Sequence, residues 1–138
     1  MQIQRRELTK AKVGYFGIGL ATYWDQFEGL KERPEGYMDK VQQRIESFGS
    51  QVISAGLVDN EFKAVEAGVR FKKEDVDLIV CYVTTYATSS TIVPIALKNK
   101  DTPILILNLQ PTAAMDYENT DTGEWLANCQ ACSAPEIS

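Results

Sequence analysis

Residues 76–83 read VDLIVCYV, and residues 84–90 read TTYATSS. A nearly continuous apolar run of this length is typical of a strand buried on both faces, and it predicts the central strand of a parallel sheet with helices on each side. The run then changes abruptly to hydroxyl-bearing side chains. Because ligands of open α/β sheets bind beyond the carboxyl ends of the strands, residues 84–90 are candidates for contact with a small polar ligand.

The rest of the chain alternates between short apolar runs and segments of helical periodicity. Strands are expected over residues 12–18, 51–55 and 103–109. Helices are expected over residues 37–48, over about 62–72, and from Ser89 or Ser90 to about Asn99. This alternation predicts right-handed crossovers between parallel strands. The expected fold class is α/β, a flavodoxin-like three-layer sandwich with a parallel sheet of strand order 2-1-3-4. Whether the sheet has a fifth strand is left open.

Two of the helices show an apolar face in the sequence. The face of the helix over 37–48 consists of Met38, Val41, Ile45 and Phe48, and Gly49 follows as a stop. In the next helix the buried face is expected to consist of Phe62, Val65, Val69 and the stem of Lys72. Its solvent face is expected to carry Lys63, Glu66 and Arg70. Asp59 is the expected N-cap of this second helix.

Length and composition are typical of one domain. The chain has 138 residues, 44% of them hydrophobic, and a net charge of −5, so we expect a single flavodoxin-like domain over residues 1–138. The acidic balance disfavours nucleic acid as a partner. No apolar stretch approaches the ~20 residues that cross a bilayer, and the N-terminus lacks the apolar core of a signal peptide. No membrane association is expected, and the expected location is cytoplasmic.

The chain contains no histidine, which removes the commonest general base and metal ligand from any mechanism of this chain alone. Cys81 lies in the central strand and is interpreted as a small core residue. Cys129 and Cys132 form a C-x-x-C pair, but a zinc site needs two more ligands. We interpret Cys129 and Cys132 as two incidental thiols rather than as a redox motif. We therefore expect neither catalytic nor metal-binding residues in this chain.

Aromatic and polar side chains gather in the loop over residues 20–27. Tyr23, Trp24 and Phe27 can form an apolar wall, while Asp25 and Gln26 offer directional hydrogen bonds. That mixture suits a sugar, whose C–H faces stack on aromatic rings while its hydroxyls need donors and acceptors. The alternative is that the aromatic rings pack on the following helix or on a partner subunit.

Uncharged polar groups also follow the other strands on the same edge of the sheet. Tyr86 and its neighbouring hydroxyls follow the central strand, and Asn108, Gln110 and Thr112 end the last strand. Such groups at neighbouring strand ends favour a neutral polyol over a phosphate or a cation. For the hydroxyls, the alternative role is helix capping and loop solvation.

The glycines of the first strand do not form a phosphate loop. Gly14, Gly17 and Gly19 match neither G-x-G-x-x-G nor G-x-x-x-x-G-K-[ST], and they are expected to serve close packing or a tight turn. The segment also lacks the acidic cluster of a phosphoacceptor domain and the Ser/Thr-rich loop of a flavin domain. Both of these classes are disfavoured.

Four segments carry a resemblance to a known family. They are YVTTY at 82–86, PIAL at 94–97, TPILILNLQ at 102–110 and EWLANCQ at 124–130. With these segments the chain resembles the N-terminal domain of the L-arabinose isomerase and L-fucose isomerase superfamily, and more closely the arabinose isomerase branch. The resemblance covers most of the chain from Lys12 onward.

The resemblance implies an aldose–ketose isomerase of carbohydrate metabolism. It implies Mn²⁺ or a similar divalent cation, held by glutamates and histidines of later domains outside this chain. It also implies that this domain packs on a neighbouring subunit of a homo-oligomer and completes that subunit's monosaccharide pocket. The substrate-binding positions that it implies are Thr22 and Tyr23 after the first strand, Tyr86 after the third, and Gln130 near the end of the domain.

The chain departs from the family pattern in two places. Where the family's first loop carries Ser-Gln-His, residues 19–22 read GLAT, and Cys129 splits the late pair of Asn128 and Gln130. These departures leave the identity of the sugar open. We interpret the chain as the N-terminal substrate-pocket and oligomerisation part of a longer enzyme, not catalytic by itself. The alternative is a stand-alone flavodoxin-like binding module without catalysis.

Overall fold

The computed structural model describes residues 9–111 and 117–122. Its strands are β1 (Lys12–Ile18), β2 (Gln51–Val58), β3 (Leu78–Val83) and β4 (Ile104–Leu107). Its helices are α1 (Glu32–Ser47), α2 (Glu61–Glu74) and α3 (Val93–Lys98), with short 3₁₀ turns η1 (Ala21–Tyr23) and η2 (Ser89–Thr91). All strand pairs are parallel, and the order is β2-β1-β3-β4. The predicted α/β class, three-layer fold and strand order are confirmed.

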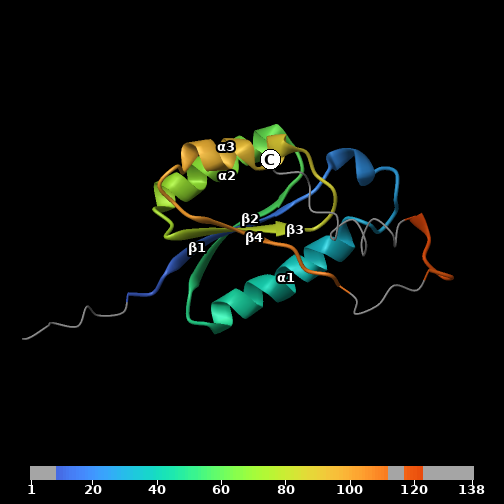
Figure 1. Cartoon of the computed structure of the whole chain (residues 1–138), viewed down its shortest axis with the longest axis horizontal. Helices are drawn as coiled ribbons and strands as arrows, with labels where there is room; N and C mark the ends of the chain where they lie inside the picture. Colours follow the sequence, from blue (N-terminus) through green and yellow to red (C-terminus); the bar gives the residue numbers. More distant parts are fainter. Residues whose placement is uncertain (1–8, 112–116, 123–138) are drawn as a thin grey trace, which may run out of the picture.

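The helices form two layers, one on each face of the sheet (Figure 1). Figure 1 shows α2 and α3 side by side above the sheet and α1 below it. Phe16 and Ile79 pack with Phe71 in the α2/α3 layer, whereas Tyr15 and Tyr82 pack in the cluster that includes α1. β1 and β3 are therefore buried on both faces, as the apolar run of β3 predicts.

Two helices begin at other residues than expected. α1 begins at Glu32 rather than near Tyr37. Pro34 lies in its first turn, where the missing N–H of proline removes no hydrogen bond within the helix. Ser89–Thr91 forms η2, and α3 begins only at Val93 without a side-chain cap. Neither of the two predicted serine caps is therefore used.

β2 is an edge strand with a bulge. Ser54 and Gly56 pair with consecutive residues of β1, which leaves Ala55 without a pairing partner in β1. Gly56 has a φ of 70°, a backbone conformation that glycine adopts without strain. The bulge lets the strand continue to Val58, three residues beyond the expected end at Ala55.

α2 buries a different face from the expected one. Phe62 is 72% exposed, and Val65 and Val69 are 49% and 48% exposed. The buried residues of α2 are Ala64, Ala67, Gly68 and Phe71. This face of small residues lets the helices approach closely, since a Cβ on Gly68 would lie 3.1 Å from the Cα of Ile95 in α3. The predicted buried face of this helix is wrong.

Cys81 is buried in β3 within the core cluster on the α2/α3 side. Burial raises the pKa of its thiol to about 12. The thiol therefore stays protonated near neutral pH and behaves as a small core group. The predicted role of Cys81 as a core residue agrees with this environment.

Cys129, Gln130 and Cys132 lie outside the described residues. In the part of the chain that is described, no helix has the length and apolarity that crossing a membrane requires.

Candidate functional site

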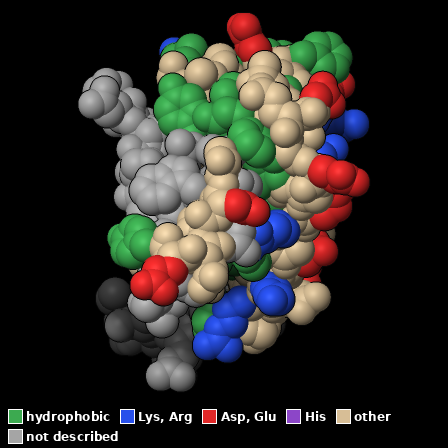
Figure 2. Space-filling view, turned by 90° about the vertical axis from the view of Figure 1, so that its right-hand side faces the viewer, with side chains coloured by type: hydrophobic (Ala, Val, Ile, Leu, Met, Phe, Trp, Pro, Cys, Tyr) green, Lys and Arg blue, Asp and Glu red, His purple; other side chains and the backbone are tan. Residues whose placement is uncertain are grey.

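The carboxyl ends of the parallel strands lie together at the edge that faces the viewer in Figure 2. Hydrophobic side chains gather in the upper part of this view, acidic side chains lie along its right margin, and Lys and Arg side chains gather in its lower part. The order β2-β1-β3-β4 places the topological switch point between β1 and β3, which is where ligands of this architecture bind. We name the surface formed by the loops over residues 19–31 and 84–88 the carboxyl-edge site.

Thr84 joins the ends of the two strands that flank the switch point. Its backbone N–H donates to the carbonyl of Ile18 at 3.4 Å, and its hydroxyl donates to the same carbonyl at 2.6 Å. Thr84 is only 3% exposed. Its side chain therefore fixes the points from which the two loops leave the sheet.

Other hydroxyls after β3 are also used within the chain. Thr85 Oγ1 donates to the carbonyl of Tyr86 at 3.0 Å, and Thr91 Oγ1 donates to the carbonyl of Thr88 at 2.8 Å. Thr85 and Thr91 are buried. The alternative role in local structure fits these two threonines better than contact with a ligand.

Tyr86 projects from the same segment. Its side chain is 42% exposed, although its neighbours Thr85 and Ala87 are both buried. A tyrosine presents an apolar ring face together with a hydroxyl that donates or accepts a hydrogen bond. Tyr86 is thus a well-anchored residue whose side chain is available at the switch point.

The aromatic side chains of the first loop pack around one leucine. Leu30 is 2% exposed, and Tyr23, Trp24 and Phe27 pack against it. The rings of Tyr23 and Phe27 meet edge to face with their centroids 6.3 Å apart. Trp24 also packs against the core cluster that contains α1 residues, so the expected packing on the following helix applies to Trp24. Tyr23 keeps part of its surface exposed.

Asp59 ties the first loop to the end of β2. Its Oδ2 accepts a hydrogen bond from Trp24 Nε1 at 2.8 Å, and its Oδ1 lies 2.8 Å from Lys63 Nζ. The N-cap of α2 is Asn60, whose Oδ1 accepts from the Lys63 N–H at 3.0 Å, so the prediction of Asp59 as the cap is wrong. Asp59 instead binds Trp24 and Lys63. The sequence feature that could have indicated this role is a carboxylate directly after an apolar strand, at the sheet edge where the loop with Trp24 also lies.

Asp59 makes the stability of the domain depend on pH. Burial acts to raise the pKa of this carboxyl, but hydrogen bonds from Lys63 and Trp24 outweigh burial and hold the pKa below its usual 3.8. The ionised carboxylate therefore stabilises the fold above its unfolded pKa, and this contribution is lost as the pH falls through the lower folded pKa. Asp59→Asn is expected to destabilise the fold at neutral pH and much less in acid.

Urea unfolding of both proteins between about pH 2 and pH 7 measures this difference. The destabilisation by Asp59→Asn should shrink toward the acid end, where the native carboxyl is also neutral. An equal loss across the whole range would mean that the charge of Asp59 contributes nothing to stability.

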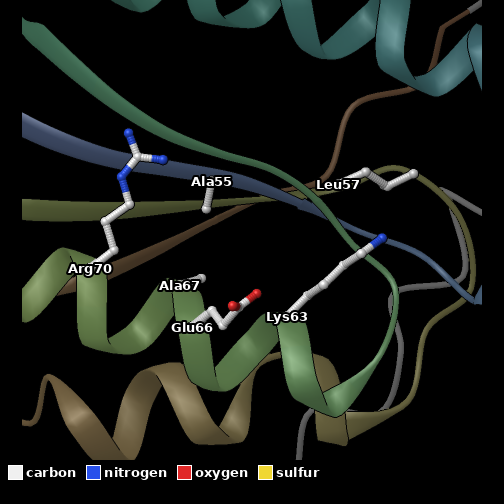
Figure 3. A pocket seen from close by; sticks show the side chains of 6 residues that line it. All are labelled: Ala55, Leu57, Lys63, Glu66, Ala67 and Arg70. Atoms are coloured by element: carbon white, nitrogen blue, oxygen red, sulfur yellow. The ribbon is translucent and has the colours of Figure 1, made fainter.

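A hollow of about 380 Å³ lies between β2 and α2 (Figure 3), lined by Ala55, Leu57, Lys63, Glu66, Ala67 and Arg70. Both of its cations are engaged by the protein. Arg70 Nη1 donates to the carbonyl of Ser54 at 2.7 Å, and Lys63 pairs with Asp59 at 2.8 Å. These contacts favour a structural role for the hollow over the binding of an anion.

A divalent cation does not fit the described residues. Over 9–111 and 117–122, no three His, Cys, Asp or Glu side chains come together as a metal site. The resemblance assigns the metal to residues outside this chain, which stays a prediction.

Three of the four predicted site residues belong to the carboxyl-edge site. Thr22 is exposed, Tyr23 is partly exposed and Tyr86 is exposed, in two loops that leave neighbouring strands. Gln130 lies outside the described residues. Comparison with known proteins adds no relative: no protein-family model matches the sequence, and no curated protein matches it. That these residues bind a sugar stays a prediction.

Proposed function

We propose that this domain is the N-terminal substrate-pocket and oligomerisation domain of a metal-dependent aldose–ketose isomerase of the arabinose/fucose isomerase type. The observation that supports the proposal best is the exposed Tyr86 in the loop after β3, together with the exposed Thr22 in the loop after the neighbouring strand β1. An exposed aromatic ring beside uncharged hydroxyls suits a neutral polyol. The four sequence segments that resemble this superfamily point to the same class of substrate.

In this proposal the domain binds and orients the monosaccharide and does not transform it. The ring of Tyr86 stacks on a C–H face of the sugar, while Thr22 and Tyr23 pair with sugar hydroxyls and Gln130 adds an amide. Residues outside this chain would hold Mn²⁺ or a similar divalent cation, which would supply Lewis-acid polarisation of the substrate oxygens. The domain completes the pocket of a neighbouring subunit in a homo-oligomer.

The first experiment is an isomerase assay with Mn²⁺ on a panel of pentoses and 6-deoxyhexoses. It compares the longest natural form of the protein with residues 1–138. Activity in the longer form alone is the expected result. A longer form that isomerises none of these sugars would contradict the proposal and favour the alternative, a stand-alone binding module.

Replacing Tyr86 tests its contact with the sugar. In the active form, Tyr86→Ala is expected to raise KM about 2- to 10-fold, because ring stacking contributes about 0.5–1.5 kcal/mol and 1.4 kcal/mol is a factor of ten. Tyr86→Phe keeps the ring and should raise KM less. Phe48→Ala is the control, since this exposed ring ends α1 at the opposite edge of the sheet. Unchanged steady-state kinetics for Tyr86→Ala would remove Tyr86 from the site.

A further inference from the structure

The turn that carries Thr22 and Tyr23 has little stability of its own. η1 is three residues long, buries none of them, and has no side-chain cap at its start, and a 3₁₀ segment of this length has poor hydrogen-bond geometry. Tyr23 packs with Phe27 and Leu30, which belong to the same loop. The position of Thr22 and Tyr23 at the carboxyl-edge site therefore depends on the contacts that connect this loop to the sheet.

Three of these contacts lead to the end of β2. Before η1, the Gly19 N–H donates to the carbonyl of Val58 at 3.2 Å. The Ala21 N–H donates to the carbonyl of Asp59, also at 3.2 Å. After η1, Trp24 Nε1 donates to Asp59 Oδ2 at 2.8 Å. Asp59 thus holds η1 from both sides, once through its backbone and once through its side chain.

The two carboxylate oxygens of Asp59 have separate partners. Oδ1 accepts from Asn60 Nδ2 at 3.0 Å and pairs with Lys63 Nζ at 2.8 Å, which anchors the carboxylate to the start of α2. Oδ2 accepts from Trp24, and a hydrogen bond to an ionised acceptor is about twice as strong as one between neutral groups. Because Asn60 is already the N-cap of α2, the helix does not need Asp59 as its cap. Asp59 therefore connects the first loop to α2.

Trp24 passes this anchoring on to the whole loop. Its ring packs in the loop cluster around Leu30 and also against the core cluster that contains Tyr82. Gly19 allows the ring to lie there, since a Cβ on residue 19 would lie 2.9 Å from Trp24 Cζ2. The indole therefore lies directly on the end of β1, and the loop moves away from the sheet only if the indole does.

We propose that Asp59 is a positioning residue of the carboxyl-edge site. It acts through Trp24 to hold η1, and so sets where Thr22 and Tyr23 meet a ligand. β2 does not border the switch point, but its end takes part in forming the site in this way. The contact of these residues with a monosaccharide rests on the proposed function, whereas their placement by Asp59 does not.

Hydrogen–deuterium exchange of the 138-residue chain at neutral pH tests the placement. Asp59→Ala and Trp24→Phe are each expected to speed exchange of the amides over residues 19–31 at least about 10-fold. A hydrogen bond to a charged group contributes about 1.5 kcal/mol or more, and 1.4 kcal/mol is a factor of ten. The double variant should exchange no faster than the faster single variant, because both changes remove the same bond.

Lys63→Met is the matched control. It removes another partner of the same carboxylate but leaves the bond between Asp59 and Trp24 in place. Because the loop can open without breaking the Lys63 ion pair, this variant should leave exchange over residues 19–31 unchanged. Circular dichroism confirms that each variant is folded.

The indole N–H of Trp24 reports on the bond itself. The chain has two tryptophans, so the Trp24 signal in a ¹⁵N–¹H spectrum is identified by its loss in Trp24→Phe. This proton should exchange slowly with water in the native chain and at least about 10-fold faster in Asp59→Ala. Asp59→Asn keeps an acceptor oxygen and should fall between the two.

Kinetics of the longer, active form test the consequence for the sugar. Asp59→Ala is expected to raise KM about 2- to 10-fold, which corresponds to one hydrogen bond of about 0.5–1.5 kcal/mol. The effect on kcat should be smaller, because this domain does not carry out the chemistry. Lys63→Met should leave both constants unchanged.

Several outcomes would overturn the proposal. Unchanged loop exchange in Asp59→Ala or Trp24→Phe would show that the bond does not hold the loop. Equal acceleration by Lys63→Met would mean that Asp59 supports the fold in general. A faster loop with an unchanged KM would remove Asp59 from the site. A longer form without isomerase activity would contradict the proposed function, whereas the exchange measurements use no sugar and decide the placement separately.

Discussion

Phe71→Ala is expected to lower the free energy of unfolding by about 3–5 kcal/mol. Phe71 is fully buried and its ring lies 6.1 Å from that of Phe16, centroid to centroid. It also covers Gly14, where an added Cβ would lie 3.0 Å from Phe71 Cδ1. Because Phe16 and Gly14 belong to a strand paired on both sides, the surroundings can collapse little into the cavity that the substitution leaves.

Urea unfolding followed by circular dichroism measures this loss, and the control is Phe62→Ala. Phe62 lies on the same helix but is 72% exposed, so its truncation should change stability by less than about 1 kcal/mol at dilutions where the chain is monomeric. The pair of variants decides which face of α2 is buried. Equal losses from the two substitutions would contradict the orientation of α2 described above.

Gly17→Ala is expected to lower the free energy of unfolding by about 1–3 kcal/mol. Gly17 lies in β1 and faces α1, where an added Cβ would contact Met38 Sδ and lie 2.7 Å from Thr84 Cγ2. Neither neighbour can move easily. Met38 is 5% exposed, and the Thr84 hydroxyl is held by the carbonyl of Ile18.

Gly36→Ala is the control for this substitution. Gly36 lies in α1, and a Cβ there would meet no heavy atom within 4 Å. The same chemical change should stabilise the fold by about 0.4–1 kcal/mol, because it reduces the freedom of the unfolded chain. The two variants are thus expected to shift the urea midpoint in opposite directions. A neutral Gly17→Ala would show that α1 yields to the added methyl group.

The sheet could be predicted from the sequence because both central strands are apolar on both faces, and such strands occur in few architectures. The buried face of α2 could not be predicted in this way. Phe62 and Phe71 are equally hydrophobic, and the choice between them depends on the small residues Ala67 and Gly68, which allow α3 to approach. Counting large apolar residues misses a helix face that is buried because its side chains are small.

The candidate site was predictable in position but not in detail. The polar residues after β3 follow directly from the end of the apolar run. Which hydroxyls remain available depends on partners that sequence patterns do not show, as for Thr84 and the carbonyl of Ile18. The bond between Trp24 and Asp59 likewise joins residues far apart in the chain, which a local pattern does not reveal.

The outer border of β2 has a consequence for the behaviour of the protein at high concentration. Arg70 donates a hydrogen bond to the carbonyl of Ser54, and the Ser54 hydroxyl accepts one from the N–H of Gly56 at 3.3 Å. An intruding strand from another molecule would have to displace both contacts and straighten the bulge at Ala55. This border therefore resists templated growth into cross-β aggregates, and the sheet is protected there even while neighbouring molecules are crowded together.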